Sequence, residues 1–158
     1  MDGTMRLTTS RFAVVLLLLT GLVGCGLIFD VSPFETPIEY QAVYVVTGAR
    51  GALHDRAGLY YELANTSGRT VARLDIAFEL YDREGSPVPR AGAHSHHVML
   101  DTIITAGTTA RFCTSLDSLV GEHADGVSPA RFRVRRAVFS DGSSWRNLTG
   151  SVYTEEIP

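Results

Sequence analysis

The apolar positions of the chain follow two different patterns. Residues 12–23 form an almost unbroken apolar run, which Arg6 and Arg11 precede. From residue 38 onward, apolar and polar residues alternate with a period of two, which is the period of a β-strand and not that of a helix. The first pattern predicts an export segment with a positive start and an apolar centre. The second predicts a β domain over residues 38–158.

The clearest strand ends near residue 81. Its apolar residues Leu74, Ile76, Phe78 and Leu80 alternate with mostly polar ones, so we expect these four side chains to face the core. Further alternating runs start near residues 38, 59, 98, 109, 132 and 152, and clusters of Gly, Asn, Asp and Ser separate several of them. In the first run, alternate positions are taken by Ile38, Tyr40, Ala42, Tyr44 and Val46.

This spacing predicts a single all-β domain, an antiparallel immunoglobulin-like β-sandwich of about seven strands. Residues 115–123 have room for one or two helical turns between late strands.

Arginines dominate one late strand. Arg131, Arg133 and Arg135 alternate, so on a regular strand they share one face. Arg136 breaks the alternation and would point inward. Because an unpaired buried guanidinium costs several kcal/mol, we predict a β-bulge at Arg135 and Arg136 that turns both outward and brings Phe139 inward. The competing solution places Arg136 at a sheet edge, with its head in water.

The three alternating arginines, Arg131, Arg133 and Arg135, are also candidate partner-binding residues. Aligned guanidinium groups attract anionic lipid, lipopolysaccharide or an acidic protein. The alternative is a solvated face on which acidic residues of neighbouring strands pair with them.

A histidine cluster is the second candidate site. On an extended chain His94 and His96 share a face, and His97 follows; imidazoles in this arrangement can chelate a metal. Since no carboxylate or thiol lies within the run, we expect a polar loop or edge strand, with a metal site as the alternative. Ser95 lacks the Gly-x-Ser-x-Gly setting of a nucleophile. The sequence therefore predicts no enzyme activity, no catalytic residue and no cofactor.

Charge and cysteine content narrow the function classes further. The net charge of −3 provides no overall field that would favour nucleic acid. The two cysteines are Cys25 and Cys113. If Cys25 carries lipid, Cys113 has no partner, so we expect no disulfide framework. Cys113 is then a small buried apolar residue rather than a reactive thiol.

Residues 22–25 (Leu-Val-Gly-Cys) end the apolar run and resemble the bacterial lipobox. The resemblance implies that the sulfur of Cys25 receives a diacylglycerol and that a peptidase cuts before it. Residues 1–24 are then a signal peptide and residues 25–37 a lipidated tether. This predicts a lipid-anchored protein of the bacterial cell envelope, outside the cytoplasm. The alternatives are a plain signal peptide or an uncleaved anchor, because residues 27–29 (Leu-Ile-Phe) lengthen the apolar run.

Residues 78–82 (Phe-Glu-Leu-Tyr-Asp) match the signature of the FxLYD domain, an immunoglobulin-like module of bacterial and archaeal envelope proteins. The Asn-Thr-Ser-Gly turn at residues 65–68 and the strand at residues 107–112 also resemble that family, so the resemblance covers about residues 57–113. The segment 91–97 departs from it by being longer and richer in His. The resemblance implies a sandwich fold and no catalytic residue.

These features favour a non-enzymatic, membrane-anchored envelope module that binds a protein or stabilises an assembly. The alternative is a metal or small-ligand carrier that uses His94, His96 and His97.

Overall fold

The computed structural model describes residues 35–88, 94–121, 124–150 and 152–153. The expected signal peptide and most of the expected tether, including Cys25, lie outside the described residues. Within the described part of the chain, no helix combines the length and the apolar character that a bilayer crossing requires.

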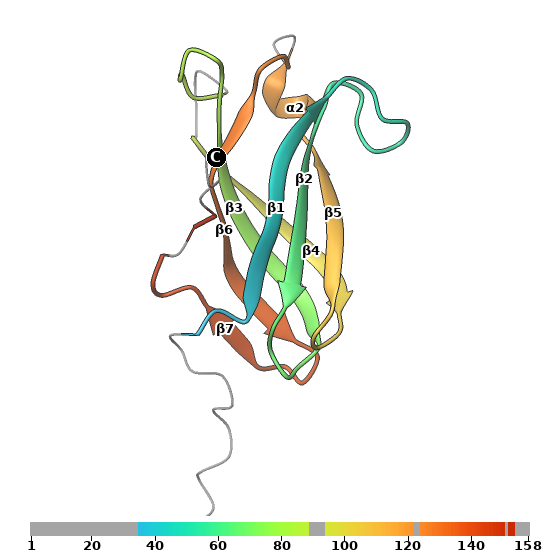
Figure 1. Cartoon of the computed structure of the whole chain (residues 1–158), viewed down its shortest axis with the longest axis vertical. Helices are drawn as coiled ribbons and strands as arrows, with labels where there is room; N and C mark the ends of the chain where they lie inside the picture. The colour runs from blue at the N-terminus through green and yellow to red at the C-terminus, as the bar shows by residue number, and fades with distance from the viewer. Residues whose placement is uncertain (1–34, 89–93, 122–123, 151, 154–158) are drawn as a thin grey trace, which may run out of the picture. The chain divides into compact units, whose positions relative to one another are not determined.

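Two antiparallel sheets pack face to face (Figure 1). The three-stranded sheet has the order β1-β2-β5, and the four-stranded sheet has the order β4-β3-β6-β7. This arrangement matches an immunoglobulin-like sandwich and confirms the predicted fold class. The strands are β1 (Ile38–Thr47), β2 (Ala57–Asn65), β3 (Val71–Tyr81), β4 (Ser95–Ile104), β5 (Thr109–Ser115), β6 (Ser128–Phe139) and β7 (Ser144–Arg146).

The core lies between the sheets. All four residues predicted to face inward from β3 are buried. Tyr61 of β2 and Phe132 of β6 meet across the sandwich, with ring centroids 5.1 Å apart, and Tyr40 of β1 approaches Phe132 edge-on. Each such apolar side chain contributes about 1.5–3 kcal/mol of burial free energy, so the period-two pattern identified the stabilising face. The buried β3 residues are Leu74, Ile76, Phe78 and Leu80.

Strand β1 does not keep one face throughout. Its register with β2 shifts between Tyr40 and Ala42. Beyond the shift Val43 is buried, whereas Tyr44 is 51% exposed. The alternation read from Ile38 to Val46 is therefore wrong in its second half, because the irregularity reverses which side chains point inward.

The predicted bulge in β6 is confirmed. Val134 pairs with Ile76, but Arg136 pairs with the preceding residue Asp75, so Arg135 is the extra residue. Both arginines are exposed and Phe139 is buried. The sheet-edge alternative for Arg136 is wrong, since β7 pairs with β6 at this position.

The end of the domain departs from the expected pattern. The last strand, β7, precedes the alternation near Val152, and an Asp-Gly turn at residues 141–142 joins it to β6. Its central residue, Trp145, is buried. One helical turn, α2 (Asp117–Val120), lies within the predicted interval 115–123.

Candidate anion-binding site

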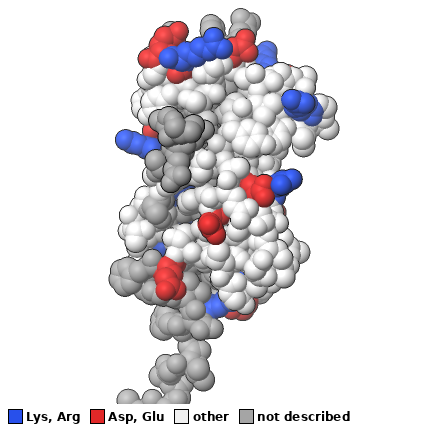
Figure 2. Space-filling model, in the orientation of Figure 1, with Lys and Arg blue, Asp and Glu red and all other residues white. Residues whose placement is uncertain are grey.

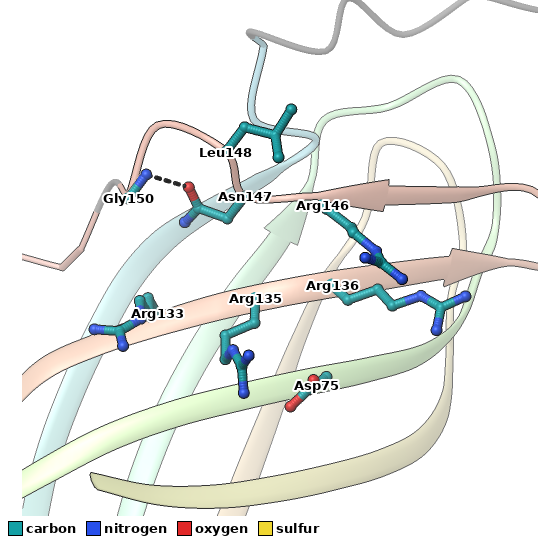
Figure 3. A pocket seen from close by; sticks show the side chains of 8 residues that line it. All are labelled: Asp75, Arg133, Arg135, Arg136, Arg146, Asn147, Leu148 and Gly150. Atoms are coloured by element: carbon teal, nitrogen blue, oxygen red, sulfur yellow. Dashed lines mark hydrogen bonds between the residues drawn. The ribbon is translucent and has the colours of Figure 1, made fainter.

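A hollow of about 360 Å³ opens on the outer face of the four-stranded sheet, where β6, β7 and the loop after β7 meet (Figure 3). We call it the arginine hollow. Four of its lining residues are arginines and only one is acidic. The lining residues are Asp75, Arg133, Arg135, Arg136, Arg146, Asn147, Leu148 and Gly150.

Strand register brings these side chains together from distant parts of the chain. Arg136 pairs with Asp75 of β3 on one side and with Arg146 of β7 on the other. Met99 of β4 pairs with Asp75 from the far side. Cross-strand partners place their Cβ atoms about 4.5–5.5 Å apart on one face of a sheet. A single row of side chains therefore crosses all four strands, and two of its four members are arginines.

The bulge increases the density of positive charge. On a regular strand, neighbouring residues point to opposite faces. The extra residue Arg135 allows Arg133, Arg135 and Arg136 all to line the same side, as Figure 3 shows. The Arg135 guanidinium donates a hydrogen bond to Nδ1 of His97 at 2.9 Å, which directs it toward β4.

The loop after β7 closes one side of the hollow. The backbone N–H of Asn147 donates to the carbonyl of Arg135 at 2.9 Å, so the loop is attached at the bulge itself. The side-chain oxygen of Asn147 accepts the N–H of Gly150 at 2.8 Å. Gly150 has φ +70°, a conformation that favours glycine. Leu148, between them, is 71% exposed on the rim.

The arginines of the hollow lack carboxylate partners within the described residues. Arginine–carboxylate pairs there join Arg69 to Asp141, Arg73 to Asp101, Arg111 to Glu62 and Arg131 to Glu79. None of these pairs includes an arginine of the hollow. Arg136 makes only a long contact of 3.5 Å with the hydroxyl of Ser144. A guanidinium presents five donors in a fork that matches carboxylate and phosphate oxygens. The hollow thus offers many unused donors in one place.

The structure changes the set of arginines that the sequence singled out. Arg133 and Arg135 line the hollow, but Arg131 does not. The pairing of β6 with β3 shifts a second time, between Ala77 and Glu79 of β3. Arg131, with φ +49°, lies in the part of β6 where this shift occurs. Its guanidinium is 3.4 Å from a carboxylate oxygen of Glu79. The prediction of three arginines in one regular row is therefore wrong, and the acid-paired alternative holds for Arg131.

Sequence reasoning did not place two residues in the site. Arg136 was expected to point outward, but not to join a cluster. Arg146 lies outside the alternating run of arginines, although the Asp-Gly turn at residues 141–142 is a signal that could have placed it. The Phe139 N–H bonds the Ser143 carbonyl at 2.9 Å across the Asp-Gly turn. Counting outward from that pair places Arg146 opposite Arg136, as observed.

The histidine cluster does not assemble into a ligand set. Nε2 of His96 lies 3.1 Å from the carbonyl oxygen of Val88, and its ring packs on Phe78 with centroids 5.6 Å apart. His97 faces the opposite side and contacts Arg135. His94 is exposed before β4 begins. Within the described residues, no group of three or more His, Cys, Asp or Glu side chains is placed to hold a metal ion.

Cys113 is half-buried and free in β5. It pairs with Tyr60 of β2 on the outer face of the three-stranded sheet. The expectation of a fully buried cysteine is therefore only partly met. Burial and the Cys113 sulfur raise the pKa of the Tyr60 hydroxyl.

The outer face of the three-stranded sheet carries a second, smaller hollow of about 310 Å³. Tyr44 and Tyr60 lie side by side there, with ring centroids 5.7 Å apart. Its one arginine, Arg111, bonds Glu62 at 2.7 Å. Figure 2, which views this side of the domain, shows few charged side chains over the centre of the sheet. This face is aromatic, and the arginine of its hollow is paired with Glu62.

Comparisons with known proteins support the fold alone. No protein-family model matches the chain, and no curated protein matches it. One solved structure is similar, that of a hypothetical protein from Peptoclostridium difficile 630. It has a TM-score of 0.54 and 13% sequence identity, over 77% of this chain and 95% of the other. The resemblance to the FxLYD domain stays a prediction.

Proposed function

We propose that the protein is a non-enzymatic binding module of the bacterial cell envelope, anchored by lipid on Cys25, and that it engages an anionic partner through the arginine hollow. The observation that carries the proposal is the set of four arginines without carboxylate partners among the described residues. Like charges at close range repel, so such a cluster lowers stability unless an anion accompanies it.

The anchor rests on the lipobox-like residues 22–25. Each buried CH₂ of an acyl chain contributes about 0.8 kcal/mol, so two or three chains make dissociation from a membrane very slow. A module held in this way meets its partners at the membrane surface. The FxLYD resemblance, with its implied envelope setting, supports the same location.

The alternative function, a metal or small-ligand carrier, receives less support. Such a carrier would need His94, His96 and His97 to converge. Because His96 and His97 are adjacent on a strand, they project to opposite faces, and each already contacts a protein group.

The anchor is tested by mass spectrometry of the mature protein. We expect an acylated Cys25 at its N-terminus, and Cys25→Ala should accumulate as an unlipidated precursor. An intact Met1 or an unmodified Cys25 in the wild type would show that the anchor is wrong.

The binding site is tested by photo-crosslinking in the native envelope. A photoreactive residue replaces Leu148 on the rim of the hollow in one variant. In the matched control it replaces Leu53, which is 55% exposed on the loop between β1 and β2. We expect adducts mainly from position 148, and equal yields from both positions would refute the assignment of the site.

A further inference from the structure

The arginine hollow lies next to the point where the tether enters the domain. The backbone N–H of Val134, between Arg133 and Arg135, donates to the hydroxyl of Tyr40 near the start of β1 at 2.9 Å. Burial raises the pKa of that hydroxyl, although the Val134 N–H and the charge of Arg133 oppose the rise. Figures 1 and 3 both show the first described residues beside the loop after β7. Residues 35–37, where the described chain begins, therefore lie beside the hollow.

The tether is too short to carry the domain far from its anchor. Nine residues lie between Cys25 and Glu35, and even when fully extended the ten Cα-to-Cα steps span only about 35 Å. A lipid on Cys25 thus keeps the hollow within about one domain diameter of the membrane surface. A short tether also holds the domain at a high effective concentration near the membrane that carries the lipid anchor, in the millimolar range.

Apolar side chains accompany the positive charge. Leu148 is 71% exposed on the rim, and Met99, which ends the row of side chains through Asp75, Arg136 and Arg146, is 77% exposed. Surfaces that lie in a membrane interface combine exposed apolar side chains with arginines or lysines. Two other carboxylates of this sheet, those of Glu79 and Asp101, are paired with Arg131 and Arg73. Only Asp75 is left to oppose an anionic surface among the residues of the hollow.

From these observations we infer that the occupant of the arginine hollow is the phosphate headgroups of the membrane to which the protein is anchored. The outer face of the four-stranded sheet then faces the bilayer, and the outer face of the three-stranded sheet points away from it and stays free. The inference rests on the proposed function and specifies its anionic partner. An acidic protein is the competing occupant, and the test distinguishes the two.

The single tryptophan of the chain reports on this geometry without a label. Trp145 lies in β7 beside Arg146, and energy transfer from it to a dansyl-labelled lipid headgroup falls steeply with distance. The full lipidated protein is reconstituted into vesicles of phosphatidylcholine alone and into vesicles that contain phosphatidylglycerol as well. Because the anchor holds the protein on both, the comparison isolates the contact of the domain. We expect more transfer on the anionic vesicles.

Variants assign the contact to the hollow. An arginine near an anionic surface contributes about a fivefold preference for the docked state. The double variant Arg136→Gln/Arg146→Gln should therefore lower the ratio of docked to undocked domain about 25-fold. Leu148→Ser should lower the transfer while leaving the charge unchanged. The charge-matched control Arg50→Gln/Arg111→Gln lies outside the hollow and should behave as the wild type. Circular dichroism verifies that each variant is folded.

Equal transfer on both kinds of vesicle, or equal losses in the hollow and control variants, would overturn the inference. Crosslinks from position 148 to a protein, together with equal transfer, would leave the proposed function standing with a protein as the partner. Absence of site-specific crosslinks of any kind would refute both this inference and the proposed function.

Discussion

The two outer faces of the sandwich use arginine in opposite ways. On the three-stranded sheet, Arg111 lies against Glu62, and the two tyrosines Tyr44 and Tyr60 lie beside this pair. On the four-stranded sheet, four arginines share one hollow with a single aspartate and form no ion pair with it. On the first face Arg111 is paired within the sheet, whereas on the second no carboxylate of the described residues takes up the arginine donors. An unpaired cluster is therefore better evidence for a binding surface than the number of arginines.

Both faces depend on the core beneath them, and the largest expected effect lies there. Phe78 is fully buried under the four-stranded sheet. Phe78→Ala should cost about 3–5 kcal/mol of unfolding free energy, through lost burial and the cavity that remains. The matched change Tyr44→Ala, on the other face, removes a half-exposed ring and should cost much less. Chemical denaturation measures both, and a cost below about 1 kcal/mol for Phe78→Ala would contradict this packing.

The next effect concerns how fully the three-stranded face is packed. A Cβ on Gly58 would overlap the imidazole of His54 and touch Sγ of Cys113. His54 is itself buried, with Nε2 3.1 Å from the Tyr60 hydroxyl. Gly58→Ala should therefore cost about 1–3 kcal/mol by overpacking. Gly58→Ala in a His54→Ala background should cost clearly less, because the clashing ring is gone. Equal costs in the two backgrounds would show that His54 does not cover Gly58.

Acid sensitivity is expected at the end of the three-stranded sheet. Asp117 accepts backbone N–H bonds from Asp55, Arg56 and Ala57, and these bonds hold the pKa of its carboxyl well below the ordinary value of 3.8. A depressed folded-state pKa contributes stability that is complete above the unfolded-state pKa and is lost as the pH falls through the folded-state pKa.

The stabilising contribution of Asp117 should therefore be constant above about pH 5, and the melting temperature should fall below about pH 4 as this contribution is lost. Asp117→Asn should lower Tm at neutral pH. It should also make the decrease of Tm at acidic pH, the acid limb of the curve of Tm against pH, less steep. Part of that limb should survive, because hydrogen bonds from Ser143 also depress the pKa of Asp141. An acid limb of unchanged steepness in the variant would refute this role for Asp117.

The smallest expected effect is the change in stability when a single arginine is removed. It tests the comparison most directly, because the sign of this change should differ between the two faces. Arg111→Gln breaks an ion pair and should lower Tm slightly. Arg146→Gln relieves repulsion within the hollow and should raise the unfolding free energy by up to about 0.5 kcal/mol. Thermal melts in low salt and in 1 M NaCl provide the control, since high salt screens both interactions. Shifts of the same sign in low salt would contradict the contrast between paired and unpaired arginines.

The amino-acid sequence by itself determined the fold class, the core face of β3 and the bulge in β6. Alternation is a local property, so residues 74–80 reveal their buried side without knowledge of their neighbours. The bulge followed from a local conflict, because regular pairing would have buried Arg136 without a partner. These inferences needed only the two-residue period of a strand and the free-energy cost of burying charge.

Only the tertiary structure decided which arginines meet. Register across strands depends on every bulge in both partners, and one extra residue reverses all later side chains. A second irregularity removed Arg131 from the expected row, and the hairpin brought Arg146 to Arg136. A similar shift turned Val43 inward and Tyr44 outward in β1. Contacts between residues far apart in sequence were equally hidden, as when Arg135 engages His97 across the sheet.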